Sequence, residues 1–136
     1  MSTLVIDTIQ GKTTAGSINV RGEGSNNTNL QQGLGKFWIN FNGTGTIAAR
    51  DSFNFTSLTD NGTGDTTITV ANNMSNVNYA HAGSSGGQNG TSNGSFYSYD
   101  QATARTTALF RTVQFNTSGA FNDTPIVECN VYGDLA

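Results

Sequence analysis

Charged residues, proline and cysteine are all scarce in this chain of 136 residues, and the scarcity excludes several classes of protein. Lysine, arginine, aspartate and glutamate make up only 11% of the sequence, and the six basic residues are scattered singly. Because nucleic-acid binding depends on clustered basic side chains, we expect no nucleic-acid partner. No apolar run approaches the roughly 18 residues of a membrane-spanning helix, so we expect no membrane partner either.

The single cysteine, Cys129, cannot form a disulfide within the chain. Its place in an apolar-alternating stretch predicts a small buried residue. The first residues, MSTLVIDTIQGK, lack the basic start and long apolar segment of a secretory signal. The nine Asn-x-Ser/Thr triplets are therefore interpreted as chance matches in a sequence rich in these residues, not as glycosylation sites.

Four small or polar residue types dominate the composition instead. Threonine, asparagine, glycine and serine number 20, 17, 17 and 12. These residues are poor helix formers, whereas threonine suits strands and the other three suit turns. Eight phenylalanines, four tyrosines and one tryptophan are too many for a disordered chain with a net charge of −3. The composition predicts an all-β protein with many short strands.

Residues 1–35 differ from the rest and are interpreted as an extended N-terminal arm. Leu4, Ile6 and Ile9 give a brief strand-like alternation, and the polar, glycine-rich stretch after them has too few apolar residues for a core of its own. We expect such an arm to become ordered against a partner chain. Residues 36–136 form the second predicted region.

Two hairpins are predicted between residues 36 and 71. In FWINF, Phe37, Ile39 and Phe41 share one face of a strand. The run NGTG occurs twice, at 42–45 and 61–64, and Asn-Gly is a strong hairpin signal because both residues tolerate positive φ. In DSFNFTSL, Phe53 and Phe55 are predicted to lie on one face of a single strand.

Further strands are predicted at 77–82, 106–115 and 126–133, with a long loop at 83–95. Leu109, Val113 and Phe115 are expected on one face, and Val127, Cys129 and Val131 on one face of the last strand. Seven or eight strands at this spacing predict an antiparallel β-sandwich of jelly-roll-like type. No helix is predicted, and DQATARTTAL is the one stretch for which a short helix stays open.

No catalytic, cofactor-binding or metal-binding residue is expected. Neither NGTG run is followed by the lysine or the amphipathic helix of a phosphate-binding loop. His81 is the only histidine and has no acid or nucleophile beside it, which favours a structural role. Asp51, Asp60 and Asp65 are interpreted as turn residues bonded to nearby amides, and whether they bind an ion stays open.

The aromatic residues after the long loop are the strongest candidates for recognition. Phe96, Tyr97 and Tyr99 follow the polar stretch at once, and tyrosine presents a flat apolar ring with a hydroxyl at its tip. Such rings suit contact with a sugar or a protein surface. The alternative is a strand with one buried face, which is common for aromatics in sheets.

Three segments resemble a known family. KFWINFNGTGTIAARDSFNFTSLTDNGTGDTTITVANNM, residues 36–74, is similar to a K-x-W-[VI]-N-F-N-G-T-G-T stretch followed by R-D-S-F-N and T-D-N-G-T-G-D. The start MSTLVIDTIQ resembles an opening that ends in D-T-[IV]-Q, and VECNVYGDLA resembles a closing strand. The family comprises small tail-fibre-like virion structural proteins of marine tailed bacteriophages, of cyanophage and pelagiphage type. Residues 80–124 have no counterpart in it.

The resemblance implies a non-enzymatic virion protein that is assembled in the bacterial host cytoplasm. It implies a homotrimeric tail fibre or spike whose arm, with Leu4, Ile6 and Ile9, attaches to other virion proteins. The β domain would then face outward and contact a host surface glycan or protein. Two alternatives stay open: a capsid decoration or head-fibre protein, and, less favoured, a polysaccharide-degrading enzyme.

Overall fold

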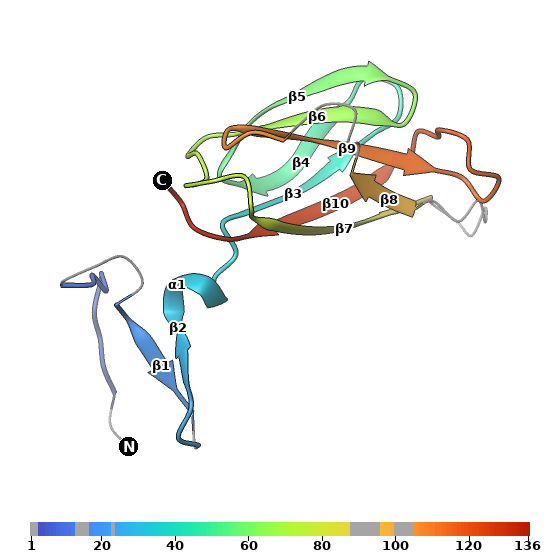
Figure 1. Cartoon of the computed structure of the whole chain (residues 1–136). Coiled ribbons are helices and arrows are strands. Elements are labelled where there is room, and N and C mark those ends of the chain that lie inside the picture. Colours follow the sequence, from blue (N-terminus) through green and yellow to red (C-terminus); the bar gives the residue numbers. More distant parts are fainter. Residues whose placement is uncertain (1–2, 13–16, 23, 88–95, 100–104) are drawn as a thin grey trace. The chain divides into compact units, whose positions relative to one another are not determined.

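The chain forms two compact units, Met1–Leu34 and Gly35–Ala136. The computed structural model describes residues 3–12, 17–22, 24–87, 96–99 and 105–136, and for residues 96–99 it describes the backbone alone. Figure 1 shows the two units, which are treated separately below.

The N-terminal unit holds a small hairpin and one helical turn. Strands β1 (Asn19–Arg21) and β2 (Asn27–Asn29) pair antiparallel, and α1 (Leu30–Gly33) follows directly. The Asn29 side chain caps this turn, because its Oδ1 accepts a 3.0 Å hydrogen bond from the backbone N–H of Gln32. None of the described residues of this unit is buried. The alternation at residues 3–12 was expected to be strand-like, but no strand forms there.

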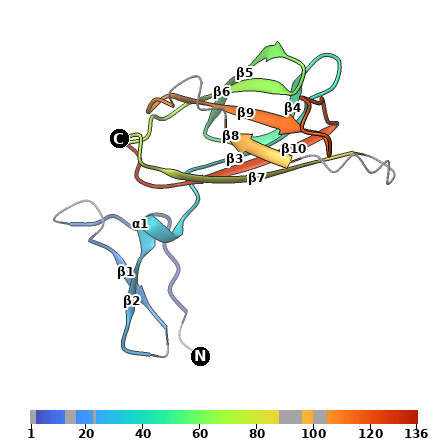
Figure 2. The same ribbon diagram turned by 45° about the vertical axis from the view of Figure 1, so that its right-hand side comes forward.

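The second unit is a sandwich of two four-stranded antiparallel sheets. Its strands are β3 (Phe37–Asn42), β4 (Ala48–Phe53), β5 (Phe55–Gly62), β6 (Asp65–Val70), β7 (Ala80–Gly86), β8 (Phe96–Tyr99), β9 (Leu109–Phe115) and β10 (Ile126–Tyr132). The strand orders are β4-β3-β10-β7 and β5-β6-β9-β8. Figures 1 and 2 both show β5, β6 and β9 stacked over β3, β10 and β7. The prediction of an all-β sandwich is confirmed, with the strand number of a jelly roll.

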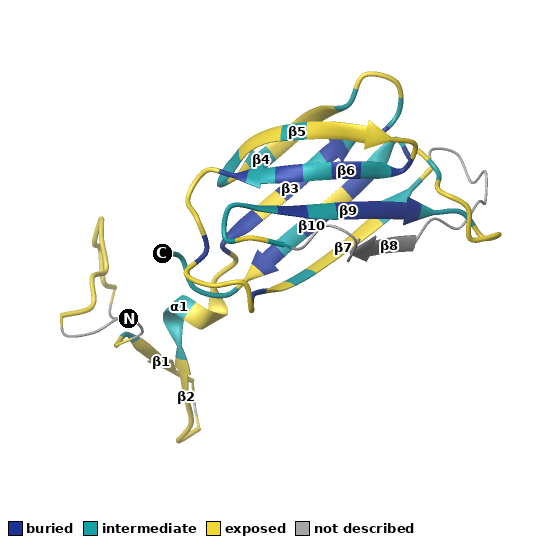
Figure 3. Cartoon of the chain, turned by 45° about the horizontal axis from the view of Figure 1, so that its top comes forward, coloured by how far each residue is buried: buried dark blue, intermediate teal, exposed yellow. Residues whose placement is uncertain are grey.

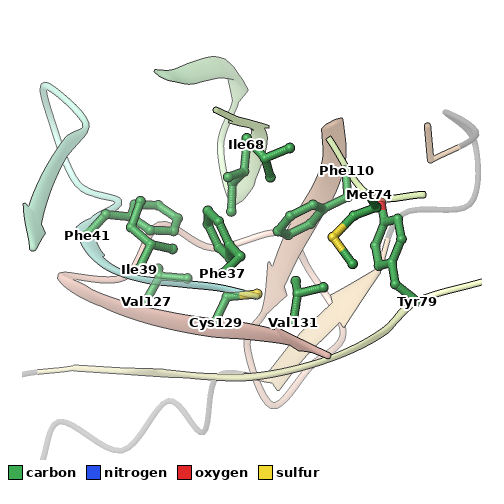
Figure 4. Packing of buried hydrophobic residues seen from close by; sticks show 11 residues of the cluster. Phe37, Ile39, Phe41, Ile68, Met74, Tyr79, Phe110, Val127, Cys129 and Val131 are labelled. Atoms are coloured by element: carbon green, nitrogen blue, oxygen red, sulfur yellow. The ribbon is translucent and has the colours of Figure 1, made fainter. Parts of the chain in front are cut away.

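The core lies between the sheets because alternate residues of the four central strands point inward. Figure 3 shows buried segments along β3, β6, β9 and β10, the two inner strands of each sheet. In Figure 4 the side chains of β3 and β10 face Ile68 and Phe110 of the opposite sheet. Phe37 and Phe110 meet edge to face, with ring centroids 5.4 Å apart. The predictions for Phe37, Ile39 and Phe41 and for the buried Cys129 are confirmed.

One predicted strand is in fact two strands in different sheets. Asn54 has a φ of 58°, the one positive φ found among the described residues other than glycine. A left-handed residue breaks the extended chain, so β4 ends at Phe53 and β5 begins at Phe55. Phe53 is consequently exposed, whereas Phe55 packs against the core. The prediction that these two rings share one face is wrong.

Both predicted hairpins form, but their corners differ in detail from the expectation. Strand β3 pairs with β4 and β5 with β6. The positive φ angles lie at Gly45, Gly62 and Gly64 rather than at the asparagines. The Asn42 side chain instead bonds within the first loop: Thr44 Oγ1 donates to its Oδ1 over 2.9 Å, and its Nδ2 donates to the Thr44 carbonyl over 2.7 Å.

The middle of the chain departs from prediction in two places. Strand β7 runs to Gly86, so residues 83–86 form an edge strand instead of the start of a loop, and residues 88–95 lie outside the described chain. On β9, Leu109, Val113 and Phe115 do share one face, but the core residue Phe110 lies on the opposite face, with buried Thr112 and Gln114. The stretch DQATARTTAL lies partly outside the described residues. Its last residue, Leu109, is the first residue of β9, and Ala108 directly precedes that strand.

Candidate functional site

The outer face of the sheet β4-β3-β10-β7 carries a group of exposed aromatic rings. Trp38 on β3 stands directly opposite Phe53 on β4, and residues opposite each other in an antiparallel pair lie on the same face. Trp38 is 42% exposed, Phe53 52% and Tyr132 43%. On β10, Asn130 stands opposite Trp38, and its amide donates a 3.4 Å hydrogen bond to the Tyr132 hydroxyl. Together Phe53, Trp38 and Tyr132 are called the outer aromatic group below.

A row of hydrogen-bonded polar side chains crosses the same face beside the outer aromatic group. Asn40 stands opposite Glu128, and its Nδ2 donates a 2.8 Å hydrogen bond to Glu128 Oε1. Ser84 on β7 stands opposite Glu128 on the other side, and its hydroxyl donates to Oε2 over 3.3 Å. Arg50 completes the row, because its Nη1 donates to Asn40 Oδ1 over 3.1 Å. These bonds hold Asn40 and Glu128 in place before any ligand binds.

A β-bulge places Arg50 in this row. The register between β3 and β4 shifts at Asn40 and Phe41, which leaves Arg50 without a residue opposite it. Bulges commonly re-aim a side chain in this way. The Arg50 guanidinium also donates to the carbonyl oxygen of Pro125, so it is anchored at two points.

A hollow of about 550 Å³ opens over β10 between β3 and β7. It is lined by residues 38–40, 82–84 and 128–130. Trp38 forms a wall on the β3 side, whereas the β7 residues on this face, Ala82 and Ser84, have only small side chains. The space therefore exists because one strand supplies a large ring and the strand on the other side supplies the smallest residues.

The hollow has the chemistry of a recognition site. Its ring offers a flat apolar surface, its amides donate and accept, and its carboxylate accepts. Glu128 is the one acid among the described residues that line it. A second acid, Asp51, stands opposite Asn40 in the same row, two strands from Glu128. Its Oδ1 accepts a hydrogen bond from the Ser52 backbone.

The predicted recognition residues lie in another sheet. The backbone of Phe96, Tyr97 and Tyr99 forms β8, in which Tyr97 pairs with Gln114 of β9. Their side chains lie outside the described part of the structure, so their role stays a prediction. In the N-terminal unit, Leu4, Ile6 and Ile9 are exposed, and their role in attachment stays a prediction.

The three acids near the turns have partners within the protein. Asp60 Oδ1 accepts a 2.9 Å hydrogen bond from the Gly62 backbone, as the turn interpretation predicted. Asp51 Oδ1 accepts a hydrogen bond from the Ser52 backbone, but Asp51 lies within strand β4, so the prediction of a turn is wrong for this residue. Asp65 instead forms a bidentate ion pair with Arg111, whose Nε lies 2.7 Å from Oδ1. Within the described residues, no three histidine, cysteine or acidic side chains gather in a group that could hold a metal ion.

His81 is half-buried, and its ring packs toward the core. Its ring lies 6.0 Å from the ring of Phe110. Burial lowers the pKa of His81 from its ordinary value, and the Arg105 guanidinium lowers it further. The side chain therefore stays neutral in the folded protein to a lower pH than a free imidazole.

The site residues that sequence reasoning missed are Trp38, Glu128 and their neighbours, although the alternation in FWINF already predicted that Trp38 points away from the core.

Comparison with known proteins assigns the chain to no family. No family model matches the chain, and neither the curated proteins nor the solved structures contain a match to it. In the described part of the chain, no helix combines the length and apolar character needed to cross a membrane.

Proposed function

We propose that the protein is a non-enzymatic structural component of a bacteriophage virion, a tail-fibre or spike-type appendage whose sandwich contacts the host surface. The resemblance of residues 36–74 and of both ends to tail-fibre-like proteins supports the virion assignment. The outer aromatic group carries the proposed contact role. Three large rings, each more than two-fifths exposed, gather on one sheet face, and contiguous exposed apolar surface of this kind typically marks an interaction site.

The N-terminal unit is proposed to attach the protein to other virion proteins. Leu4 and Val5 are at least 80% exposed, and no described residue of this unit is buried. Each apolar side chain that docks in a partner would gain about 25 cal/mol for each Å² removed from water.

A homotrimer is proposed as the assembled form. A small chain with little core per residue gains stability when subunits bury surface against one another. Light scattering on the purified protein is expected to give three times the chain mass of 14.3 kDa. A concentration-independent mass of 14.3 kDa would contradict the trimer.

The test of the proposed function has two parts. Antibody labelling of intact virions is expected to mark the tail, whereas label on the capsid would favour the head-fibre alternative. Purified protein is expected to adsorb to host cells, and a Trp38→Ala, Phe53→Ala variant is expected to adsorb at least about tenfold more weakly, since central aromatic contacts dominate interfaces. Release of reducing sugar from host envelope, lost in Asp51→Asn or Glu128→Gln, would overturn the non-enzymatic assignment.

A further inference from the structure

We propose that the hollow over β10 binds one neutral sugar unit of a glycan, with Trp38 as the stacking surface and Asn40, Glu128 and Asn130 as hydrogen-bonding partners. The inference deepens the proposed host contact and rests on it for the source of the glycan. It concerns strands of the sheet that does not contain β8, where the sequence had pointed.

The shape of the hollow fits a small, flat ligand. Its volume of about 550 Å³ lies within the usual range for small-molecule sites. Trp38 lines one side, and Phe53 stands opposite it in the sheet, away from the hollow. One face of a pyranose ring consists of C–H groups, which pack on an indole as an apolar surface does. The small side chain of Ala82, which stands opposite Asn130, leaves room for the ring on the β7 side.

The polar groups are arranged for the rim of hydroxyls around such a ring. Each Glu128 oxygen accepts one hydrogen bond, from Asn40 or from Ser84, and keeps a further lone pair for a sugar hydroxyl. Because Arg50 orients the Asn40 amide and Asn40 orients the carboxylate, little side-chain freedom remains to be lost on binding. A pre-ordered acceptor beside an exposed ring is the arrangement that a polyhydroxylated ligand needs.

The negative charge at the hollow favours a neutral sugar over an acidic one. Among the described residues that line the hollow, Glu128 is the charged one, and the Arg50 guanidinium is already bonded to Asn40 and to the Pro125 carbonyl. The whole chain carries a formal net charge of −3. A uronic or sialic acid would place its carboxylate near Glu128 and be repelled. Neutral hexoses and N-acetylhexosamines have no such penalty.

The single tryptophan makes the test direct. Trp38 is the only tryptophan in the chain, so selectively excited emission reports on the hollow itself. Titration of the purified full chain with trisaccharides of glucose, galactose, mannose and N-acetylglucosamine is expected to shift this emission saturably. At least one should bind with a Kd of about 1 mM or tighter. Bound sugar should also protect Trp38 from quenching by iodide.

Two variants and one control separate the site from the fold. Glu128→Gln keeps the shape but weakens the acceptor, and is expected to lower affinity about tenfold, as for other hydrogen bonds to a charged group. Ala82→Leu fills the hollow from an exposed position on an edge strand and is expected to abolish binding while the melting temperature is retained. Phe121→Ala removes another exposed aromatic ring, which stacks on Phe115, and is expected to leave binding unchanged.

Each result decides the inference. Two results would overturn the inference and leave the proposed function standing. One is adsorption to host cells while no saccharide changes the Trp38 emission. The other is equal binding of a sialylated trisaccharide. Saccharide binding without host adsorption supports the inference and removes the proposed host contact. A further outcome is that iodide fails to quench Trp38 emission in the absence of sugar but quenches it after the protein is diluted. A second copy of the chain would then cover the hollow, and the inference fails. Unchanged affinity in Ala82→Leu also overturns it.

Discussion

The side-chain carbonyl of Asn54 accepts a 2.6 Å hydrogen bond from the backbone N–H of Asn72, at the corner where the chain passes from one sheet to the other. The Asn54 amide donates to the carbonyls of Lys36 and Asn72 over 2.9 Å and 3.1 Å. A single left-handed residue thereby joins the start of β3, the start of β5 and the end of β6.

This corner predicts a graded loss of stability. Asn54→Gly keeps the positive φ but removes the side-chain bonds, and is expected to cost about 1–2 kcal/mol. Asn54→Ala also adds the strain of a left-handed alanine, for a total of about 2–4 kcal/mol. Urea denaturation measures both. Equal losses in the two variants would show that the backbone conformation is not the constraint.

The repeated NGTG run predicts a matched pair of glycine variants. Gly45 and Gly64 occupy the same place in the two runs and have φ angles of 60° and 64°. A Cβ on Gly64 would lie 2.6 Å from the Asn122 nitrogen and 2.8 Å from the Gln114 oxygen, whereas one on Gly45 would meet nothing within 4 Å.

Gly45→Ala is therefore expected to cost about 1–2 kcal/mol from backbone strain alone. Gly64→Ala is expected to cost more than about 4 kcal/mol or to prevent folding, since backbone atoms must move. Thermal denaturation of the two variants side by side checks this. Similar melting temperatures for the two would contradict the close approach at Gly64.

The ion pair of Asp65 and Arg111 predicts a loss of stability that depends on salt. Both side chains are largely shielded, at 14% and 21% exposed, and the pair is bidentate. Asp65→Asn is expected to cost about 1–2 kcal/mol, with a smaller difference from wild type in high salt. Asp60→Asn is the control, because an asparagine Oδ1 can still accept the Gly62 bond; it is expected to change stability by less than about 0.5 kcal/mol.

His81 predicts a loss of stability in mild acid. Because its pKa in the folded protein is lowered from the ordinary value of 6.5, the unfolded chain binds the proton more readily. Stability contributed by neutral His81 is complete above that value and decreases as the pH falls through it, until the folded protein is protonated as well. The melting temperature between about pH 8 and about pH 5 should fall less in His81→Gln than in wild type. An identical fall in both proteins would contradict this assignment.

Local periodicity accounts for the part of the fold that could be predicted. In FWINF the alternation separates Phe37, Ile39 and Phe41 from Trp38, and in IVECNVY it separates Val127, Cys129 and Val131 from Glu128. Neighbouring side chains on a strand must point to opposite faces, so a few residues suffice to define the buried face. Hairpin partners were predictable for the same reason, since they are joined by short loops.

The strand end at Phe53 and Asn54 could not be predicted from local periodicity. The pattern DSFNF is compatible with one continuous strand, and what ends it is a set of bonds from Asn54 to Lys36 and Asn72. The predicted site residues Phe96, Tyr97 and Tyr99 are neighbours in the sequence and follow one polar stretch. The site in the structure instead joins residues that no short window contains, such as Asn40 and Glu128.

The sequence by itself determined the all-β class, the inward faces of β3 and β10 and the two glycine-rich hairpins, because composition and a two-residue period act over a few neighbouring residues. Only the tertiary structure decided which strands lie beside one another. By pairing β3 with both β4 and β10, it set Trp38 between Phe53 and Asn130 and Asn40 beside Glu128. Sheet order is settled by long-range packing of whole faces, and that packing is what turns separate polar and aromatic residues into one surface.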